Sequence, residues 1–297
     1  MTNTQVLPMP GTDGPRSPDA RGAREATLVI EPSGRLPRIH IRELWAYRGL
    51  FFFLVWRDIK VRYAQTVLGA AWAILQPVMT TLVFTVVFGM LASIPSDGAP
   101  YAVFALAGLV PWTYFATALS GSSNSLVSNT TLITKVYFPR LVIPLTPVLA
   151  GLVDFAVAFV VLLLVMLGFG VVPSASALVL VPLLVVAMML TAAGVGCWLS
   201  ALNIQYRDVK HVVPFLVQVW MYASPVVYPA SLVPERYRTL YALNPMVGVI
   251  EGFRAVLLGT GEFPFESIAI SLGAGLVLLG TGALYFRKTE RVFADVA

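Results

Sequence analysis

The chain has 297 residues, of which 58% are hydrophobic and only 12% charged, and its mean hydropathy is +0.80. An ordinary soluble domain carries roughly 25% charged residues, so this composition excludes a soluble globular protein and indicates an integral membrane protein. The net charge is +5, but the basic residues fall in short connecting segments. They are therefore interpreted as topology and lipid-headgroup signals, and we expect no nucleic-acid partner.

The first part of the chain is polar and its next helix is too short to cross a membrane. Residues 1–40 are rich in proline and glycine and lack the apolar core of a signal peptide, so we predict a disordered cytoplasmic arm. An amphipathic helix is predicted at 41–65, where the uncharged run 49–56 has only eight residues. Crossing a bilayer takes about 20 residues. Its aromatic and apolar residues share one helical face, which predicts a helix lying in the membrane interface: Trp45, Gly49, Phe52, Trp56, Ile59 and Tyr63.

The remaining apolar segments predict six transmembrane helices, at 67–91, 101–122, 142–168, 177–200, 212–229 and 266–286. The fifth is marginal because it contains Pro214 and Pro225, and we expect it to pack against protein. Between the fifth and sixth spans, at about 230–264, an apolar stretch too short to cross begins at Asn244 and Pro245, a favourable helix start. We therefore predict an all-α integral membrane protein with an N-terminal interface helix and a re-entrant helical segment before the last span.

The basic residues predict the topology of these spans, which together cover 66–287. The short loops 92–100 and 171–176 contain no lysine or arginine. All lysines of the chain fall in segments that the six-span arrangement places on the opposite side: Lys60, Lys135, Lys210 and Lys288. By the positive-inside rule both termini, including a tail at 288–297, are predicted to be cytoplasmic.

Four motifs carry a resemblance to a known family. They are RDIKVRYAQTVLGAAWAILQP at 57–77, KVYFPRLVIP at 135–144, NIQYRDVKHVVPFLVQVWMYASPVVYP at 203–229 and NPMVGVIEGFR at 244–254. In their order and spacing the chain, over about residues 40–290, resembles permease subunits of polysaccharide-type ABC exporters.

The resemblance implies a type II ABC exporter fold in the bacterial cytoplasmic (inner) membrane. It implies a homodimer bound to two copies of a separate ATPase subunit, which holds ATP and Mg on the cytoplasmic side. The implied cargo is a polyprenyl-diphosphate-linked polysaccharide such as O-antigen, capsule or teichoic acid.

Catalytic chemistry has little support in the sequence. A phosphate-cradling loop needs the pattern GxxxxGK[ST], and no lysine here follows a glycine. We expect no catalytic residue, cofactor or metal ion on this chain. The histidines, His40 and His211, do not neighbour a pair of carboxylates, which disfavours the alternative of a membrane enzyme acting on lipid-linked sugars. A permease for a smaller molecule is the other alternative.

Two cytoplasmic elements are candidate sites. On the interface helix, cations beside aromatic rings are suited to bind the diphosphate of a lipid-linked glycan: Trp56, Arg57, Lys60, Arg62 and Tyr63. ATPase contact and plain anchoring are the alternatives. The resemblance places a coupling helix, which docks on the ATPase, in the loop at about 123–141. Its candidate residues and those of the next cytoplasmic turn are Lys135, Tyr137, Phe138, Arg140, Arg207 and Asp208. The alternatives are a charged connector and a local salt bridge.

Other candidates lie within the membrane or at its outer face. Asp154 is the one ionisable residue deep inside a span, and we favour a structural hydrogen bond to a neighbouring helix over a proton-relay role. Glu251 and Arg254 are spaced to pair and close the outer mouth, or to form a solvated pair. Aromatic candidates for a sugar path, with core or lipid packing as the alternative, are Trp72, Phe84, Phe88, Tyr114, Phe115, Tyr222 and Tyr228.

Overall fold

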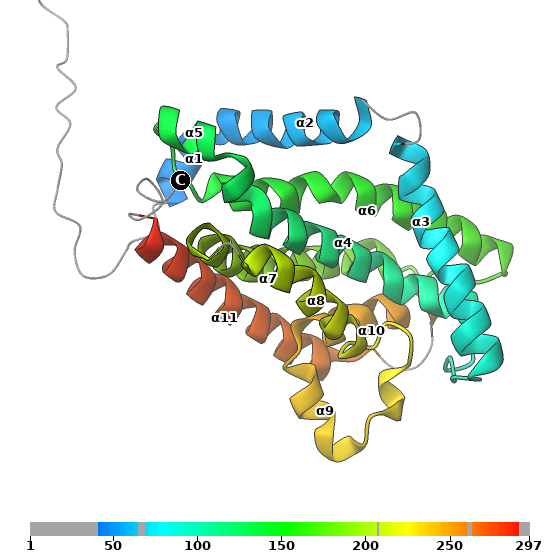
Figure 1. Cartoon of the computed structure of the whole chain (residues 1–297). Helices are drawn as coiled ribbons and strands as arrows, with labels where there is room; N and C mark the ends of the chain where they lie inside the picture. The colour runs from blue at the N-terminus through cyan, green and yellow to red at the C-terminus, as the bar shows by residue number, and fades with distance from the viewer. Residues whose placement is uncertain (1–40, 65–68, 207, 260–262, 291–297) are drawn as a thin grey trace, which may run out of the picture. The chain divides into compact units, whose positions relative to one another are not determined.

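The structure, a computed structural model, describes residues 41–64, 69–206, 208–259 and 263–290. Within these ranges every regular element is helical, which confirms the predicted all-α fold class. The arm predicted at 1–40 lies outside the described residues, as does most of the predicted tail. In chain order the helices are α1 (Ile41–Ala46), α2 (Arg48–Ala64), α3 (Gly69–Phe84), the π-helix η1 (Thr85–Leu91), α4 (Tyr101–Ser128), α5 (Thr130–Lys135), α6 (Val142–Gly168), α7 (Ala177–Gln205), α8 (Val209–Tyr222), the 3₁₀-helix η2 (Ala230–Leu232), α9 (Glu235–Ala242), α10 (Pro245–Leu258) and α11 (Phe265–Thr289) (Figure 1).

Among the described residues, five helical segments are long and apolar enough to cross a membrane: Ile74–Leu91, Tyr101–Ser128, Val142–Gly168, Ala177–Gln205 and Phe265–Thr289. At 1.5 Å of rise per residue, α6 with its 27 residues extends about 40 Å, more than the about 30 Å of a hydrocarbon core. These segments confirm the first four predicted spans and the sixth as long apolar helices. The first two residues of the predicted first span, 67 and 68, lie outside the described residues.

The fifth predicted span, 212–229, differs from what the structure shows. Helix α8 has 14 residues and ends at Tyr222, so at about 1.5 Å per residue it is too short to cross by itself. Its end is explained by Pro225, which has no N–H to donate and disfavours helical backbone at Ser224. The chain continues from there through turns in which residues 224–227 are buried.

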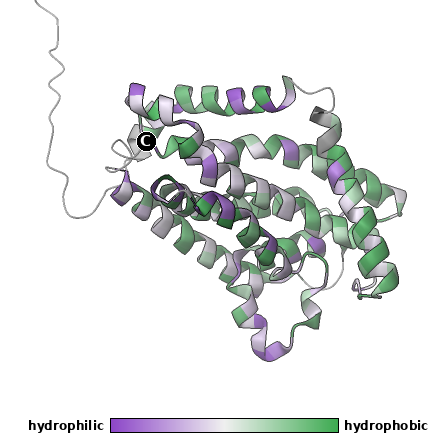
Figure 2. Ribbon diagram, in the orientation of Figure 1, coloured by the Kyte–Doolittle hydropathy of each residue, from purple (hydrophilic) through white to green (hydrophobic). Residues whose placement is uncertain are grey.

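Helices α9 and α10 form the bent pair that the sequence predicts between the last spans. They meet at an angle of 107°, the geometry of a broken span or a re-entrant segment. The predicted helix start is confirmed: the Asn244 side chain caps α10 by accepting a hydrogen bond from the Met246 N–H at 3.1 Å, with Pro245 in the first turn. Figure 2 shows hydrophilic residues on α9, in contrast to the mostly hydrophobic α3.

Helix α4 forms the centre of the fold and α3 lies at its edge (Figure 1). Of the apolar windows of these spans, that of α4 is 78% buried and that of α3 with η1 only 11%. Helix α4 packs against α6, α7 and α10, and α7 packs closely against α11. At that crossing a Cβ atom on Gly194 would lie 2.5 Å from the Leu279 backbone nitrogen, so only glycine allows the two backbones to approach this closely.

A second apolar cluster gathers segments that are far apart in the sequence. Around the end of α4 it joins the following buried residues: Leu126, Ile133, Phe138, Leu141, Ile143, Cys197, Ala201, Ile204 and Phe286. Leu44, Tyr47 and Leu50 of α1, α2 and their junction pack against it. The end of the molecule at which α4, α7 and α11 finish is called the α5 end. The opposite end, at which α4 begins, is called the α10 end. Segments that the sequence predicts to be cytoplasmic therefore meet at the α5 end.

Candidate functional site

Helix α2 lies alongside α6 (Figure 1) and contacts it. Leu54 is its one buried residue among those described. The aromatic side chains Trp45, Phe52 and Trp56, which the sequence places on one face, are exposed. Such a face is suited to lipid contact. The position of α2 in the membrane interface stays a prediction.

The cations of α2 have different surroundings, which the sequence alone does not reveal. Arg57 is paired with the neighbouring Asp58, with Nη2 and the carboxylate oxygen 2.8 Å apart. The same nitrogen donates to Asn129 Oδ1 at 3.0 Å, so α2 is bonded to the residue that precedes α5. Lys60 is exposed. Asn129 was not among the predicted site residues, and only its position between an apolar helix and a polar loop marks it in the sequence.

Arg62 and Tyr63, at the end of α2, both bond to Asp154 of α6. The Arg62 guanidinium forms an ion pair with the carboxylate, and the Tyr63 hydroxyl donates to its other oxygen. This confirms the prediction that Asp154 bonds to a neighbouring helix. Asp154 follows Val142 by twelve residues, which places it about 18 Å along α6. The end of α2 is therefore tied to the middle of a spanning helix.

Tyr63 is a hydrogen-bond donor at all physiological pH values. Burial, reinforced by the hydrogen bond to Asp154, raises the pKa of the Tyr63 hydroxyl to about 12. The phenol therefore stays protonated and able to donate to a carboxylate or another anionic oxygen.

The predicted coupling segment contains the short helix α5, which is followed by one exposed and one buried aromatic residue. Lys135 ends α5 and is exposed, as is Tyr137, at 86% of its surface. Phe138 is only 5% exposed because it packs into the cluster of the α5 end. Arg140 Nη1 donates to the Glu290 carbonyl at 2.6 Å, which ties this segment to the end of α11. Asp208 is exposed, whereas Arg207 lies outside the described residues.

At the α10 end, the described hydrogen bonds of Arg254 run to backbone carbonyls, and its pairing with Glu251 at the outer mouth stays a prediction. Arg254 is 5% exposed and donates to the backbone carbonyls of Phe104, Val226 and Tyr228, at 3.3, 2.6 and 3.2 Å. Its guanidinium carbon lies 3.6 Å from the centre of the Phe104 ring. The carbonyls of Val226 and Tyr228, which lie in turns, and that of Phe104 in α4 thus satisfy the buried cation, and they attach the segment after α8 to α4 and α10.

The candidate sugar-path aromatics divide between the core and partly open positions. Tyr114 and Phe115 are buried in the core, where the Tyr114 hydroxyl donates to the Val148 carbonyl at 2.8 Å, in agreement with the core-packing alternative. Phe84 and Phe88 meet edge to face with centroids 5.4 Å apart. Tyr222 is exposed, and its carbonyl accepts a hydrogen bond from the Tyr228 hydroxyl at 2.9 Å. The side chain of Trp72 lies outside those that the structure describes.

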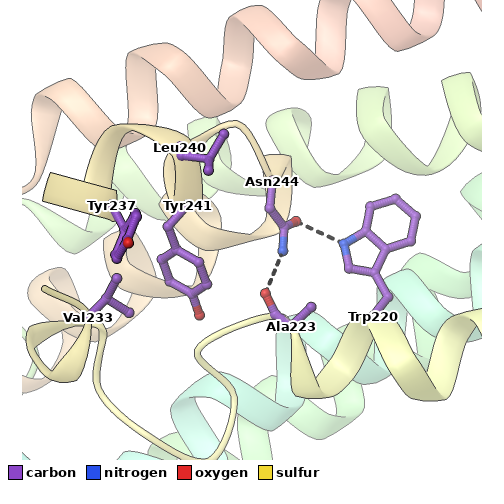
Figure 3. Close-up of a pocket in the computed structure, with 7 residues that line it drawn as sticks. All are labelled: Trp220, Ala223, Val233, Tyr237, Leu240, Tyr241 and Asn244. Carbon is purple, nitrogen blue, oxygen red and sulfur yellow. Dashed lines mark hydrogen bonds between the residues drawn. The ribbon is translucent and has the colours of Figure 1, made fainter.

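An open pocket of about 400 Å³ lies where α8, α9 and the start of α10 meet (Figure 3). Its lining is mainly apolar and aromatic: Trp220, Ala223, Val233, Tyr237, Leu240, Tyr241 and Asn244. The Asn244 amide connects the lining of the pocket to α8 and the residue after it. Its oxygen accepts from Trp220 Nε1 at 2.9 Å, and its nitrogen donates to the Ala223 carbonyl at 3.0 Å. Neither Asn244 nor Trp220 was among the predicted site residues.

Long apolar helices around a buried α4 indicate a multi-pass membrane protein. The chain belongs to the ABC-2 type transporter family, whose sequence model matches residues 49–258. This confirms the resemblance and the expectation of a transport subunit in place of an enzyme.

Curated relatives match nearly along their full length. The chain is 32% identical to an O-antigen export system permease protein of Myxococcus xanthus, over 86% of this chain and 98% of the relative. It is 28% identical to an O-antigen export system permease protein of Klebsiella pneumoniae, over 81% and 92%. A polysialic acid transport protein of Escherichia coli is 26% identical, over 79% and 91%.

Proposed function

We propose that this chain is the permease subunit of an ABC exporter that moves a lipid-linked polysaccharide across the bacterial cytoplasmic membrane. The observation that carries the proposal is the match to an O-antigen export permease over 98% of that relative's length. The polyprenyl-diphosphate form of the substrate is proposed from the cationic residues that α2 carries next to exposed aromatic rings, a combination that suits a phosphorylated lipid.

Binding of the diphosphate is assigned to the end of α2. Lys60 is exposed and offers a point charge, while Arg57 and Arg62 offer forked donors to phosphate oxygens. Trp56 is exposed on the same helix and suited to anchor it among lipids. Because Arg57 and Arg62 already bond to Asn129 and Asp154, substrate binding at this place involves an exchange of partners.

The proposed assembly is a homodimer with two copies of an ATPase subunit that supply ATP and Mg. The apolar segment Ile74–Leu91 of α3 and η1 is only 11% buried within one chain. A second copy of the chain is proposed to pack against this surface. The ATPase is proposed to dock at the α5 end, where Tyr137 and Lys135 are exposed on a rigidly packed segment. The lysine distribution supports a cytoplasmic α5 end and cytoplasmic termini.

Depletion of the chain in its native cell tests this function. Lipid-linked glycans are extracted and profiled by mass spectrometry before and after depletion. Export by this chain predicts that a complete lipid-linked polymer accumulates inside the cell and disappears from its surface. Arrest at a shorter precursor, or an unchanged profile, contradicts the proposal.

A further inference from the structure

The contact between α2 and Asp154 has the features of a releasable bond. A carboxylate in the middle of a spanning helix is costly unless it is paired, and here it receives an arginine and a tyrosine from two adjacent positions. The ion pair is only partly buried, because the Arg62 and Asp154 side chains are 41% and 28% exposed. Another anion can therefore reach Arg62 without unfolding of the core.

The two halves of α2 are attached in different ways. The first half is held by packing, with Leu54 buried and Leu50 against the cluster of the α5 end. In the second half, residues 58–64, no side chain is buried. The described bonds of this half to α6 include those of Arg62 and Tyr63 to Asp154, and polar bonds exchange more readily for other polar bonds than buried apolar contacts do.

We propose that Asp154 is an internal competitor for the anion site of α2, which the diphosphate of the substrate displaces to release the end of α2 from α6. The inference rests on the proposed function. A diphosphate has more charge and more acceptor oxygens than a carboxylate, so it bonds Arg62 in forked geometry and also accepts from the Tyr63 hydroxyl. A neutral lipid or a weak anion does not compensate for leaving Asp154 unpaired. Asp154 is therefore a positioning residue that selects for a strongly anionic headgroup.

An internal competitor has a consequence that a merely structural residue lacks. Consider a ligand that binds only those molecules in which the end of α2 is released from α6. Its apparent affinity is lowered because only a small fraction of the molecules is in this state. Removing the competing charge raises that fraction, so the variant binds the diphosphate more tightly. Loss of a purely structural contact leaves the affinity the same or weakens it.

The test uses the full transporter, this chain with its ATPase, in lipid nanodiscs. The probe is a polyprenyl diphosphate without glycan, and the readout is the concentration that gives half-maximal stimulation of ATP hydrolysis. We expect Asp154→Asn to lower this concentration about three- to tenfold, where tenfold corresponds to about 1.4 kcal/mol. Asp154→Glu retains the charge, and we expect it to show the same half-maximal concentration as the wild type. Asp97→Asn removes a carboxylate that lies before α4, at the α10 end, and accepts a hydrogen bond from Ser231, so it is the control for loss of a negative charge away from α2.

A second measurement follows α2 itself and does not depend on the folding of the Asp154 variant. Spin labels at Val61 of α2 and Val160 of α6, both exposed, report the distance between the helices in a background that lacks Cys197. We expect the diphosphate to lengthen this distance, the neutral polyprenol to leave it unchanged, and Asp154→Asn to lengthen it without ligand.

The outcomes separate this inference from the proposed function. If the wild type responds to the diphosphate but Asp154→Asn binds it no more tightly and α2 does not move, the competitor role is wrong while the proposed function stands. If the wild-type transporter does not respond to the diphosphate in either assay, both the competitor role and the proposed diphosphate substrate are wrong.

Discussion

Arg254 shows how a single charge is held inside this fold. The sequence suggests a partner three residues away, Glu251, because ion pairs at this spacing are common on helices. The structure satisfies the guanidinium with three carbonyls from α4 and from the turns after α8. Carbonyl acceptors this far along the chain can be assigned only once the tertiary arrangement is known. Arg254 is therefore a buried attachment point, in contrast to the solvated pair that is one of the two alternatives from the sequence.

Space for this arginine depends on Gly108. A Cβ atom there would lie 2.6 Å from Arg254 Nη2 and 2.9 Å from the Val226 carbonyl oxygen. We predict that Gly108→Ala destabilises the protein by about 1–3 kcal/mol, the usual cost of overpacking a filled core. The measurement is the midpoint of thermal unfolding of the purified protein in detergent.

A matched control exists on α11. A Cβ on Gly280 meets nothing within 4 Å, and alanine favours a helix by about 1 kcal/mol over glycine. Gly280→Ala should therefore unfold at the wild-type temperature or slightly above it. Equal midpoints for the two variants would mean that Gly108 does not make room for Arg254.

Asp154 is a case where the kind of interaction was predictable but the partners were not. Its isolation in an apolar span predicts a hydrogen-bonded partner, since an unpaired buried charge is expensive. The partners lie 92 and 91 residues away, and no local pattern links them. The contact follows from α2 lying along α6, which the amphipathic pattern of α2 does not specify.

At the level of elements, α5 and the residues after it combine an exposed contact with a rigid support. Tyr137 and Phe138 are neighbours, yet one is 86% exposed and the other 5%. The sequence places both among the coupling residues. Only the structure shows that Phe138 belongs to the same buried cluster as Leu126, Ile204 and Phe286 and supports the segment from within.

This difference predicts opposite effects for two adjacent substitutions. Phe138→Ala should lower the stability of the chain by about 3–5 kcal/mol, as for other buried phenylalanines. Tyr137→Ala should change stability by no more than about 0.5 kcal/mol but weaken co-purification of the ATPase and its stimulation by substrate. Thermal unfolding and pull-down of the ATPase measure the two effects.

Tyr137→Phe retains the ring and serves as the control for the contact. It is expected to retain most of the ATPase association. Full association and coupling in Tyr137→Ala would show that the ATPase docks elsewhere, and wild-type stability in Phe138→Ala would contradict the packing of the α5 end.

The helix boundaries show where sequence reasoning succeeds and fails for elements. Long apolar runs are recovered because lipid demands about 20 apolar residues in a helix; the third span was predicted at 142–168 and α6 is Val142–Gly168. The sequence predicts a fifth span that extends to residue 229, beyond the end of α8 at Tyr222, because the apolar composition continues past this residue. Composition does not distinguish a helix from a buried turn, and Pro225 marked the end of α8.

For the whole molecule, the α5 end connects the proposed ATPase site with the proposed substrate site. Asn129, next to α5, bonds to Arg57 of α2, and α2 in turn bonds to Asp154. These bonds link α5 to the helix that carries the proposed headgroup cations. This continuity gives a physical route by which ATP binding on a partner and substrate binding on this chain can influence each other.

The central claim is tested most directly by transport in proteoliposomes that contain this chain and its ATPase, with the ATPase facing outward. Lipid-linked polymer is placed in the outer leaflet, ATP is added, and the fraction of polymer protected from an added glycosidase is measured over time. Our account predicts protection that requires ATP and is abolished by an ATPase variant unable to hydrolyse it. Polymer that stays fully accessible, or protection that does not depend on ATP, would contradict it.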